Sequence, residues 1–220
     1  MELCTIFGHK FKNPLLLKQA LTHPSSLVKP NYQKLEFLGD RILGLVMAEY
    51  LFENFPDKKE GALAKRHVSL VCGASLTAVA KANNLGELII MSKGEASSGG
   101  RENSSNLADV VEAIIAAIFL DVNDYHYVKN ILVELWSDKL RLIEETPPDP
   151  KSQLQELLQA KKYPLPLYKL IEQSGPAHAP AFKMSLKLPK LGEEIITASS
   201  KKKAEVALAK KMLERLKNAT

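Results

Sequence analysis

This sequence lacks the features of a disulfide-rich or membrane-spanning protein. Its 220 residues contain only two cysteines, Cys4 and Cys72, which lie far apart and form no C-x-x-C pair. A structural zinc site or a disulfide framework is therefore not expected, and a reducing cytoplasm fits this cysteine usage. The first residues show no basic start followed by an apolar run, so no secretory signal is expected. No run of about 18 uncharged apolar residues occurs, so no membrane span is expected either.

Charge is distributed unevenly along the chain. The net charge is +5, but residues 147–220 carry 14 Lys and Arg against 7 Asp and Glu. Residues 1–146 carry 16 against 18. A basic C-terminal third beside a slightly acidic body indicates that one part holds a polyanion such as nucleic acid and that the other does something else. A small domain can also be basic by chance, so charge alone does not decide.

A polar segment with three prolines, residues 144–150, divides the chain. Proline cannot continue a helix, so we interpret this segment as a boundary. We expect a first domain at residues 1–145, a linker at 146–150 and a second domain at 151–220. Each half is long enough to bury a core of its own.

The hydrophobic periodicity differs between the two halves. Before the boundary it predicts helices and no strands, so this part should be all-α; the helices are expected at 15–21, 35–52, 62–82, 105–121 and 125–144. After the boundary it predicts a helix at 151–161, strands at 167–173, 181–188 and 193–198, and a helix at 199–216. This α-β-β-β-α order predicts a small α+β module with its helices on one face of an antiparallel sheet.

Two of the most apolar predicted helices carry pairs of acids. Glu36 and Asp40 are four residues apart, and Asp109 and Glu112 are three apart, so each pair shares one face of its helix. Isolated acids among Leu, Val and Ile would be costly. Two such pairs can form an all-oxygen site for a hard cation such as Mg²⁺, which can activate water and stabilise a phosphodiester transition state.

The alternative is that these acids are solvated or pair with basic neighbours such as Arg41, Lys65 or Arg66. A diiron-type bundle is a further class of protein with buried carboxylates, but it uses Glu-x-x-His. None of the five histidines stands in that relation to an acid.

Several short motifs together resemble the ribonuclease III family. Residues 34–40, Lys-Leu-Glu-Phe-Leu-Gly-Asp, resemble its signature, whose usual form is Glu-Arg-Leu-Glu-Phe-Leu-Gly-Asp. Further segments that resemble the family, in the same order along the chain, are Ala20–Ser25, Glu60–Ala64, Gly94–Glu95, Ser98–Arg101 and Asn106–Ala113. The C-terminal module is similar to a double-stranded-RNA-binding domain, so the resemblance covers nearly the whole chain.

The resemblance implies a homodimeric endoribonuclease that hydrolyses double-stranded RNA and leaves 5′-phosphate and 3′-hydroxyl ends. Glu36, Asp109 and Glu112 would hold Mg²⁺, for which Mn²⁺ can substitute, and Asp40 and Glu112 would be most essential to cleavage. Glu60 matches a further acid that contacts the metal or orders the site. The usual substrates of the family are ribosomal RNA precursors and structured messenger RNAs.

The sequence departs from the family at the start of the signature, where Gln33 replaces the first acid and Lys34 replaces the following arginine. Glutamine keeps hydrogen bonding but loses the charge, so we do not count this position as a ligand. The four core acids are intact. We therefore favour an active enzyme over the alternative, a double-stranded-RNA-binding protein whose nuclease-like domain only dimerises.

Three regions of the C-terminal module are expected to contact an RNA duplex, which proteins recognise by its shape, phosphates and 2′-hydroxyls. The start of the last predicted helix, residues 199–216, would offer its N–H groups and its lysines to a phosphate. The expected contacts are Ser152, Gln155 and Glu156 in one minor groove, His178 in the next, and Ser200, Lys201 and Lys202 at a phosphate. The alternatives are a solubilising lysine run and an ordinary loop histidine. Glu205 stands where the family often has lysine, which predicts a somewhat weaker grip.

Overall fold

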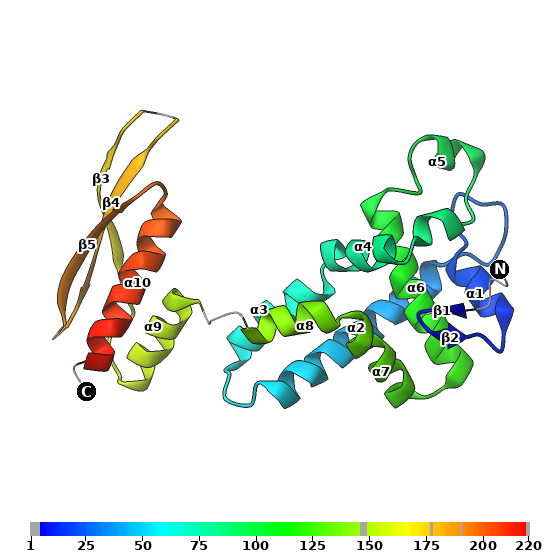
Figure 1. Cartoon of the computed structure of the whole chain (residues 1–220), viewed down its shortest axis with the longest axis horizontal. Helices are drawn as coiled ribbons and strands as arrows, with labels where there is room; N and C mark the ends of the chain where they lie inside the picture. The colour runs from blue at the N-terminus through cyan, green and yellow to red at the C-terminus, as the bar shows by residue number, and fades with distance from the viewer. Residues whose placement is uncertain (1–4, 146–148, 177, 190, 219–220) are drawn as a thin grey trace. The chain divides into compact units, whose positions relative to one another are not determined.

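The computed structural model describes residues 5–145, 149–176, 178–189 and 191–218. The chain forms two compact units, Met1–Glu145 and Thr146–Thr220, each with its own hydrophobic core (Figure 1). Among the described helices, none combines the length and the apolar composition that crossing a bilayer requires.

The first unit is built around α6, which packs against helices α1, α2, α4 and α7. The helices of this unit are α1 (Pro14–Ala20), α2 (Gln33–Asn54), α3 (Glu60–Val71), α4 (Gly73–Ala82), the 3-10 helix η1 (Leu85–Leu88), α5 (Lys93–Ser97), α6 (Ser104–Val122), α7 (Tyr125–Leu135) and α8 (Ser137–Glu145). Asn103 caps α6 by accepting hydrogen bonds from the N–H groups of Ser105 and Asn106, at 2.8 and 3.3 Å. Most of α6 is buried, as its largely apolar sequence predicts.

Two helices that we expected to be continuous are each broken. The first breaks at Cys72, whose backbone is extended, and α4 begins at Gly73, a poor helix former. In a continuous helix, the Ser69 carbonyl would accept the N–H of Gly73. Here it accepts the Ser75 hydroxyl instead, at 2.8 Å. The second breaks at Trp136, which is fully buried and donates its indole N–H to the Leu70 carbonyl at 2.9 Å. At each break, therefore, a side chain donates a hydrogen bond to a carbonyl near the end of α3.

The first unit also contains a short hairpin, which corrects the expectation that it holds no strands. Strands β1 (Thr5–Ile6) and β2 (His9–Lys10) pair antiparallel. Asp121, near the end of α6, anchors this region: its carboxylate accepts the N–H groups of Lys12 and Asn13, both at 2.8 Å, and contacts His9 Nε2 at 3.0 Å. Two-residue strands are too short to leave an alternating pattern in the sequence.

The second unit has the predicted α-β-β-β-α order. Its elements are α9 (Pro150–Ala160), β3 (Tyr168–Ser174), β4 (Ala181–Leu188), β5 (Gly192–Ala198) and α10 (Lys201–Asn218). The strands form an antiparallel sheet in the order β3-β4-β5, and α9 and α10 lie side by side against one face of it (Figure 1). Helix α9 begins at Pro150 because Asp149 accepts the N–H of Ser152 at 3.2 Å and proline suits the first helical position.

Candidate active site

Three carboxylates from two helices meet in the first unit. Glu36 of α2 and Asp109 and Glu112 of α6 each offer one oxygen, and these three oxygens lie within 4.8 Å of one another. All three residues are partly buried. The helical spacing predicted two separate pairs, and the packing of α2 against α6 joins members of both into one cluster.

A glycine in the signature segment makes this close packing possible. A Cβ atom at Gly39 would lie 1.8 Å from the main-chain oxygen of Glu112, far inside any tolerable contact. Helices α2 and α6 therefore approach each other through backbone at the level of the acids. This explains a glycine in a helix interior, where it costs roughly 0.5–1 kcal/mol relative to alanine.

Mutual repulsion and burial disfavour ionisation of the cluster. The pKa of Glu112 is raised to about 8, chiefly by burial and next by the charge of Asp40. Burial likewise raises the pKa of Glu36 and of Asp109 above their ordinary values. A divalent cation would reverse this cost, and three carboxylate oxygens are a donor set that suits a hard cation.

Asp40 lies beside the cluster but is not one of the three mutually close acids. Its side chain is 44% exposed, and its carboxylate is 3.4 Å from Arg41 Nη1. An ion pair this exposed contributes little to stability. The charge of Asp40 raises the pKa of Glu112, so Asp40 belongs to the electrostatic environment of the cluster.

The predicted accessory acid Glu60 and the departing signature residue Gln33 both lie outside the cluster. Glu60 is exposed at the first residue of α3. Gln33 is exposed at the first residue of α2, where its side-chain oxygen accepts a hydrogen bond from Asn31 Nδ2 at 3.2 Å.

Sequence reasoning missed a tyrosine that supports the site. The Tyr32 hydroxyl donates to Asp109 Oδ2 at 3.2 Å. Burial, followed by the charge of Asp109, raises the pKa of Tyr32 well above its ordinary value, so the hydroxyl stays protonated and donates. Its only sequence signal is its place directly before α2, which does not predict a contact with a residue 77 positions away.

In the second unit, the predicted phosphate contacts gather at the start of α10. Lys201 and Lys202 are exposed in its first turn. The Ser200 hydroxyl accepts the N–H of Lys203 at 3.2 Å, so Ser200 caps the helix and keeps its hydroxyl hydrogen for another acceptor. Lys201 Nζ also lies 5.9 Å from the centre of the Phe182 ring.

The predicted minor-groove residues of the second unit differ in accessibility. Gln155 is exposed and Glu156 is half-buried on α9. The Ser152 hydroxyl donates to Asp149 at 3.2 Å. His178 is exposed in the turn before β4; Ala177, in the same predicted loop, lies outside the described residues.

The acid at position 205 has a partner inside the second unit. Glu205 of α10 accepts a hydrogen bond from Lys151 Nζ of α9 at 2.5 Å. The pair joins the two helices and neutralises one cation near the predicted RNA-binding surface. Glu205, which we expected to weaken RNA binding, therefore also pairs with a lysine that could otherwise contact RNA.

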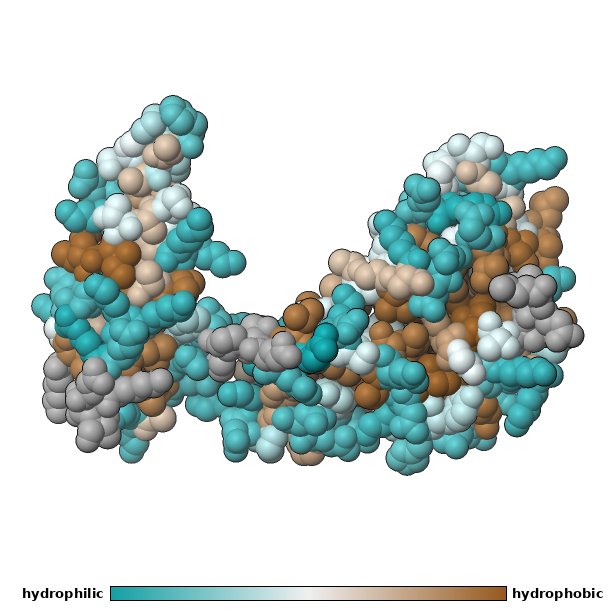
Figure 2. Space-filling model, in the orientation of Figure 1, coloured by the Kyte–Doolittle hydropathy of each residue, from teal (hydrophilic) through white to brown (hydrophobic). Residues whose placement is uncertain are grey.

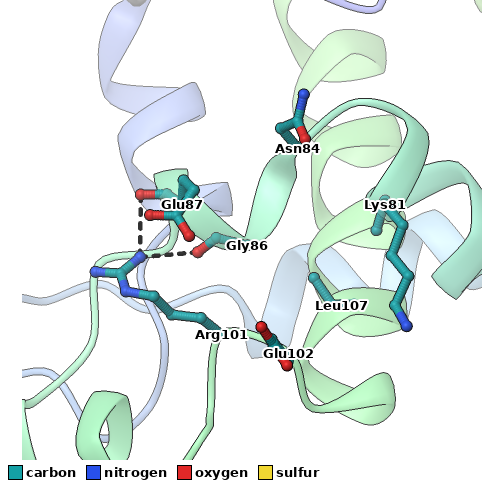
Figure 3. A pocket seen from close by; sticks show the side chains of 8 residues that line it. Lys81, Asn84, Gly86, Glu87, Arg101, Glu102 and Leu107 are labelled. Carbon is teal, nitrogen blue, oxygen red and sulfur yellow. Dashed lines mark hydrogen bonds between the residues drawn. The ribbon is translucent and has the colours of Figure 1, made fainter.

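A separate pocket lies beside the start of α6 (Figure 3). Its lining includes Lys81, Glu87, Arg101 and Glu102, and none of the four predicted catalytic acids. Arg101 Nη1 donates to the carbonyls of Gly86 and Glu87, at 2.8 and 3.0 Å. This arginine thus ties η1 to the segment that leads into α6.

Two family models match the chain. Residues 13–135 match the model described as ribonuclease-III-like, and residues 150–216 match the double-stranded RNA binding motif. The first match contains the carboxylate cluster and Asp40, and the second contains the exposed lysines of α10.

Similar proteins agree with these matches. Ribonuclease 3 of Wolbachia sp. subsp. Brugia malayi is 43% identical over 97% of this chain and 90% of that protein. Ribonuclease 3 of Ehrlichia canis is 43% identical over 96% of this chain and 94% of that protein. The solved nuclease domain of ribonuclease III from Campylobacter jejuni is 43% identical with a TM-score of 0.57, over 59% of this chain and 90% of that domain. The chain belongs to the ribonuclease III family of endoribonucleases.

Proposed function

We propose that this protein hydrolyses phosphodiester bonds of double-stranded RNA at the carboxylate cluster of its first unit. The observation that carries the proposal is the meeting of Glu36 with Asp109 and Glu112 within 4.8 Å. Gathering three acids in a partly buried site is costly, and binding a cation offsets that cost. The match of the second unit to a double-stranded RNA binding motif supports the substrate class.

Glu36, Asp109 and Glu112 would hold Mg²⁺, and Mn²⁺ can substitute because it also accepts oxygen ligands. Activation of water and neutralisation of charge at the phosphate are the chemistry that such a cation supplies when bound. Asp40, whose side chain is 44% exposed, can accept a hydrogen bond from water or from the RNA. Glu60 would be an accessory acid that contacts the metal or orders the site.

The proposed hydrolysis adds water to phosphorus and breaks the bond to the 3′ oxygen. It therefore leaves a 5′-phosphate on one product and a 3′-hydroxyl on the other. Ribosomal RNA precursors and structured messenger RNAs contain the duplex segments that such an enzyme would cut.

The proposed enzyme is a homodimer formed by the first unit. Phe37, Leu45 and Phe52 of α2 are 68%, 58% and 74% exposed. They are eight and seven residues apart, so they lie along one face of the helix. Hydrophobic residues also reach the surface of this unit in the view of Figure 2. A second copy would cover these exposed apolar side chains, since exposed apolar patches mark interaction surfaces. The similar Campylobacter jejuni nuclease domain has a region involved in dimer formation.

The proposed RNA contacts use the second unit. Lys201, Lys202 and Ser200 would bind a phosphate at the start of α10, where the helix dipole favours an anion. Ser152, Gln155 and Glu156 would face one minor groove and His178 the next. Because duplex RNA is recognised mostly by its shape, its phosphates and its 2′-hydroxyls, the proposed recognition depends on duplex form.

Cleavage of a labelled perfect RNA duplex, with and without Mg²⁺, tests the proposed function. We expect shortened products with 5′-phosphate ends only when Mg²⁺ or Mn²⁺ is present. The competing function is a double-stranded-RNA-binding protein with an inactive nuclease-like domain. An intact duplex after incubation with Mg²⁺, under conditions where a gel shift shows binding, would favour that function.

A further inference from the structure

Tyr32 touches both helices that contribute to the carboxylate cluster. Its main-chain carbonyl accepts the N–H of Glu36 at 2.9 Å, so it takes part in the first turn of α2. Its hydroxyl donates to Asp109 of α6 at 3.2 Å. One residue thus holds the backbone at one predicted ligand and the side chain of another.

Tyr32 is itself held firmly in place. It is 2% exposed, and its N–H donates to the Thr22 carbonyl at 2.9 Å. The His23 ring packs against it edge to face, with centroids 5.7 Å apart. The nitrogens of His23 are engaged by Ser25 Oγ at 2.8 Å and by Asn106 Oδ1 at 3.2 Å.

We propose that Tyr32 is a positioning residue whose hydroxyl fixes the orientation of the Asp109 carboxylate for a divalent cation. The proposal rests on the proposed function, because it assumes that Asp109 is a ligand. A hydrogen bond to Oδ2 leaves the other carboxylate oxygen available to the cation. Without the hydroxyl, repulsion from Glu112 and Glu36 favours rotation of Asp109 away from the cluster.

The expected effect is moderate. Groups that hydrogen-bond a metal ligand typically change metal affinity by roughly 10- to 100-fold. The distance of 3.2 Å is longer than the usual range for a hydroxyl donor, which places the expected loss at the lower end. We therefore expect Tyr32→Phe to weaken divalent-cation binding about tenfold.

The test is a Mn²⁺ titration of the full chain without RNA, followed by electron paramagnetic resonance of free Mn²⁺. Tyr32→Phe keeps the buried ring and removes only the hydroxyl. Tyr50→Phe is the matched control, because the hydroxyl of Tyr50, a residue of helix α2, donates to Glu144 at 2.6 Å instead. We expect a Kd for Mn²⁺ raised about tenfold for Tyr32→Phe and unchanged for Tyr50→Phe. At saturating Mn²⁺, Tyr32→Phe should cleave RNA at nearly the wild-type rate. Its defect should be only that cleavage requires a higher concentration of Mn²⁺.

An unchanged Kd for Tyr32→Phe overturns the inference when Asp109→Asn does weaken binding. If Asp109→Asn also binds as wild type does, the metal site of the proposed function is wrong. If Tyr32→Phe melts much lower than wild type, its effect is measured again in the Asp109→Asn background. If Tyr32→Phe still weakens Mn²⁺ binding in that background, its effect does not depend on Asp109, and the inference is overturned. If it no longer weakens Mn²⁺ binding there, the inference is supported.

Discussion

Replacing Glu112 by glutamine tests two consequences of the carboxylate cluster: its proposed role in cleavage and its cost to the stability of the metal-free protein. Glu112→Gln keeps the size of the side chain and its hydrogen-bonding capacity but removes the charge that would bind a cation. We expect cleavage to fall by several orders of magnitude, because the substituted site loses one of its three proposed ligands. Binding of duplex RNA should persist, since it rests on the second unit.

The same substitution should stabilise the metal-free protein. The pKa of Glu112 is about 8 in the folded chain against an ordinary 4.5, so the folded state disfavours the ionised form. Because the folded pKa is the higher one, this cost is absent below pH 4.5, grows as pH rises and is complete above about pH 8. At 1.36 kcal/mol per pH unit, the gain from Glu112→Gln at pH 7 has an upper limit of about 3 kcal/mol.

The assay compares urea unfolding of wild type and Glu112→Gln in EDTA at pH 5 and pH 8, beside cleavage of a labelled duplex in saturating Mg²⁺. We expect the two proteins to be nearly equally stable at pH 5, with the variant clearly more stable at pH 8. Cleavage at a near wild-type rate would refute the assignment of the metal site. Equal stability at both values of pH would refute the argument that burial and the neighbouring acids disfavour an ionised Glu112 when no cation is bound.

Three further tests address the rest of the structure. Gly39→Ala should destabilise the first unit by roughly 1–3 kcal/mol or more in urea, since the added methyl would meet the α6 backbone. Gly44→Ala on the same helix has room and should be tolerated, and equal effects would contradict the close approach. Lys201→Ala with Lys202→Ala should weaken binding to all duplex sequences alike, with a salt slope shallower by roughly 0.7–0.9 per lost phosphate contact; an unchanged slope would mean that both face solvent. Leu45→Glu should convert the proposed dimer to a monomer in sedimentation, and a dimer at micromolar concentration would argue against this face.

Patterns that depend on near neighbours were readable from the sequence. The spacing of four acids on two apolar helices indicated a cation site, and the change of period after residue 150 predicted the α-β-β-β-α module, which the structure confirms. These features were predictable because helix and strand periods place residues a few positions apart on the same face.

Features that depend on distant residues were decided by the tertiary structure. The break at Trp136 satisfies the carbonyl of Leu70, and the contact of Tyr32 with Asp109 spans 77 positions. No local pattern records which distant partner a side chain will meet. Likewise, Gly39 stands out in the sequence only as a glycine inside a helix, and it took the packing of α2 on α6 to show that a backbone oxygen occupies the space of its missing side chain. The sequence thus determined which acids stand on which helix, whereas long-range packing decided how they meet.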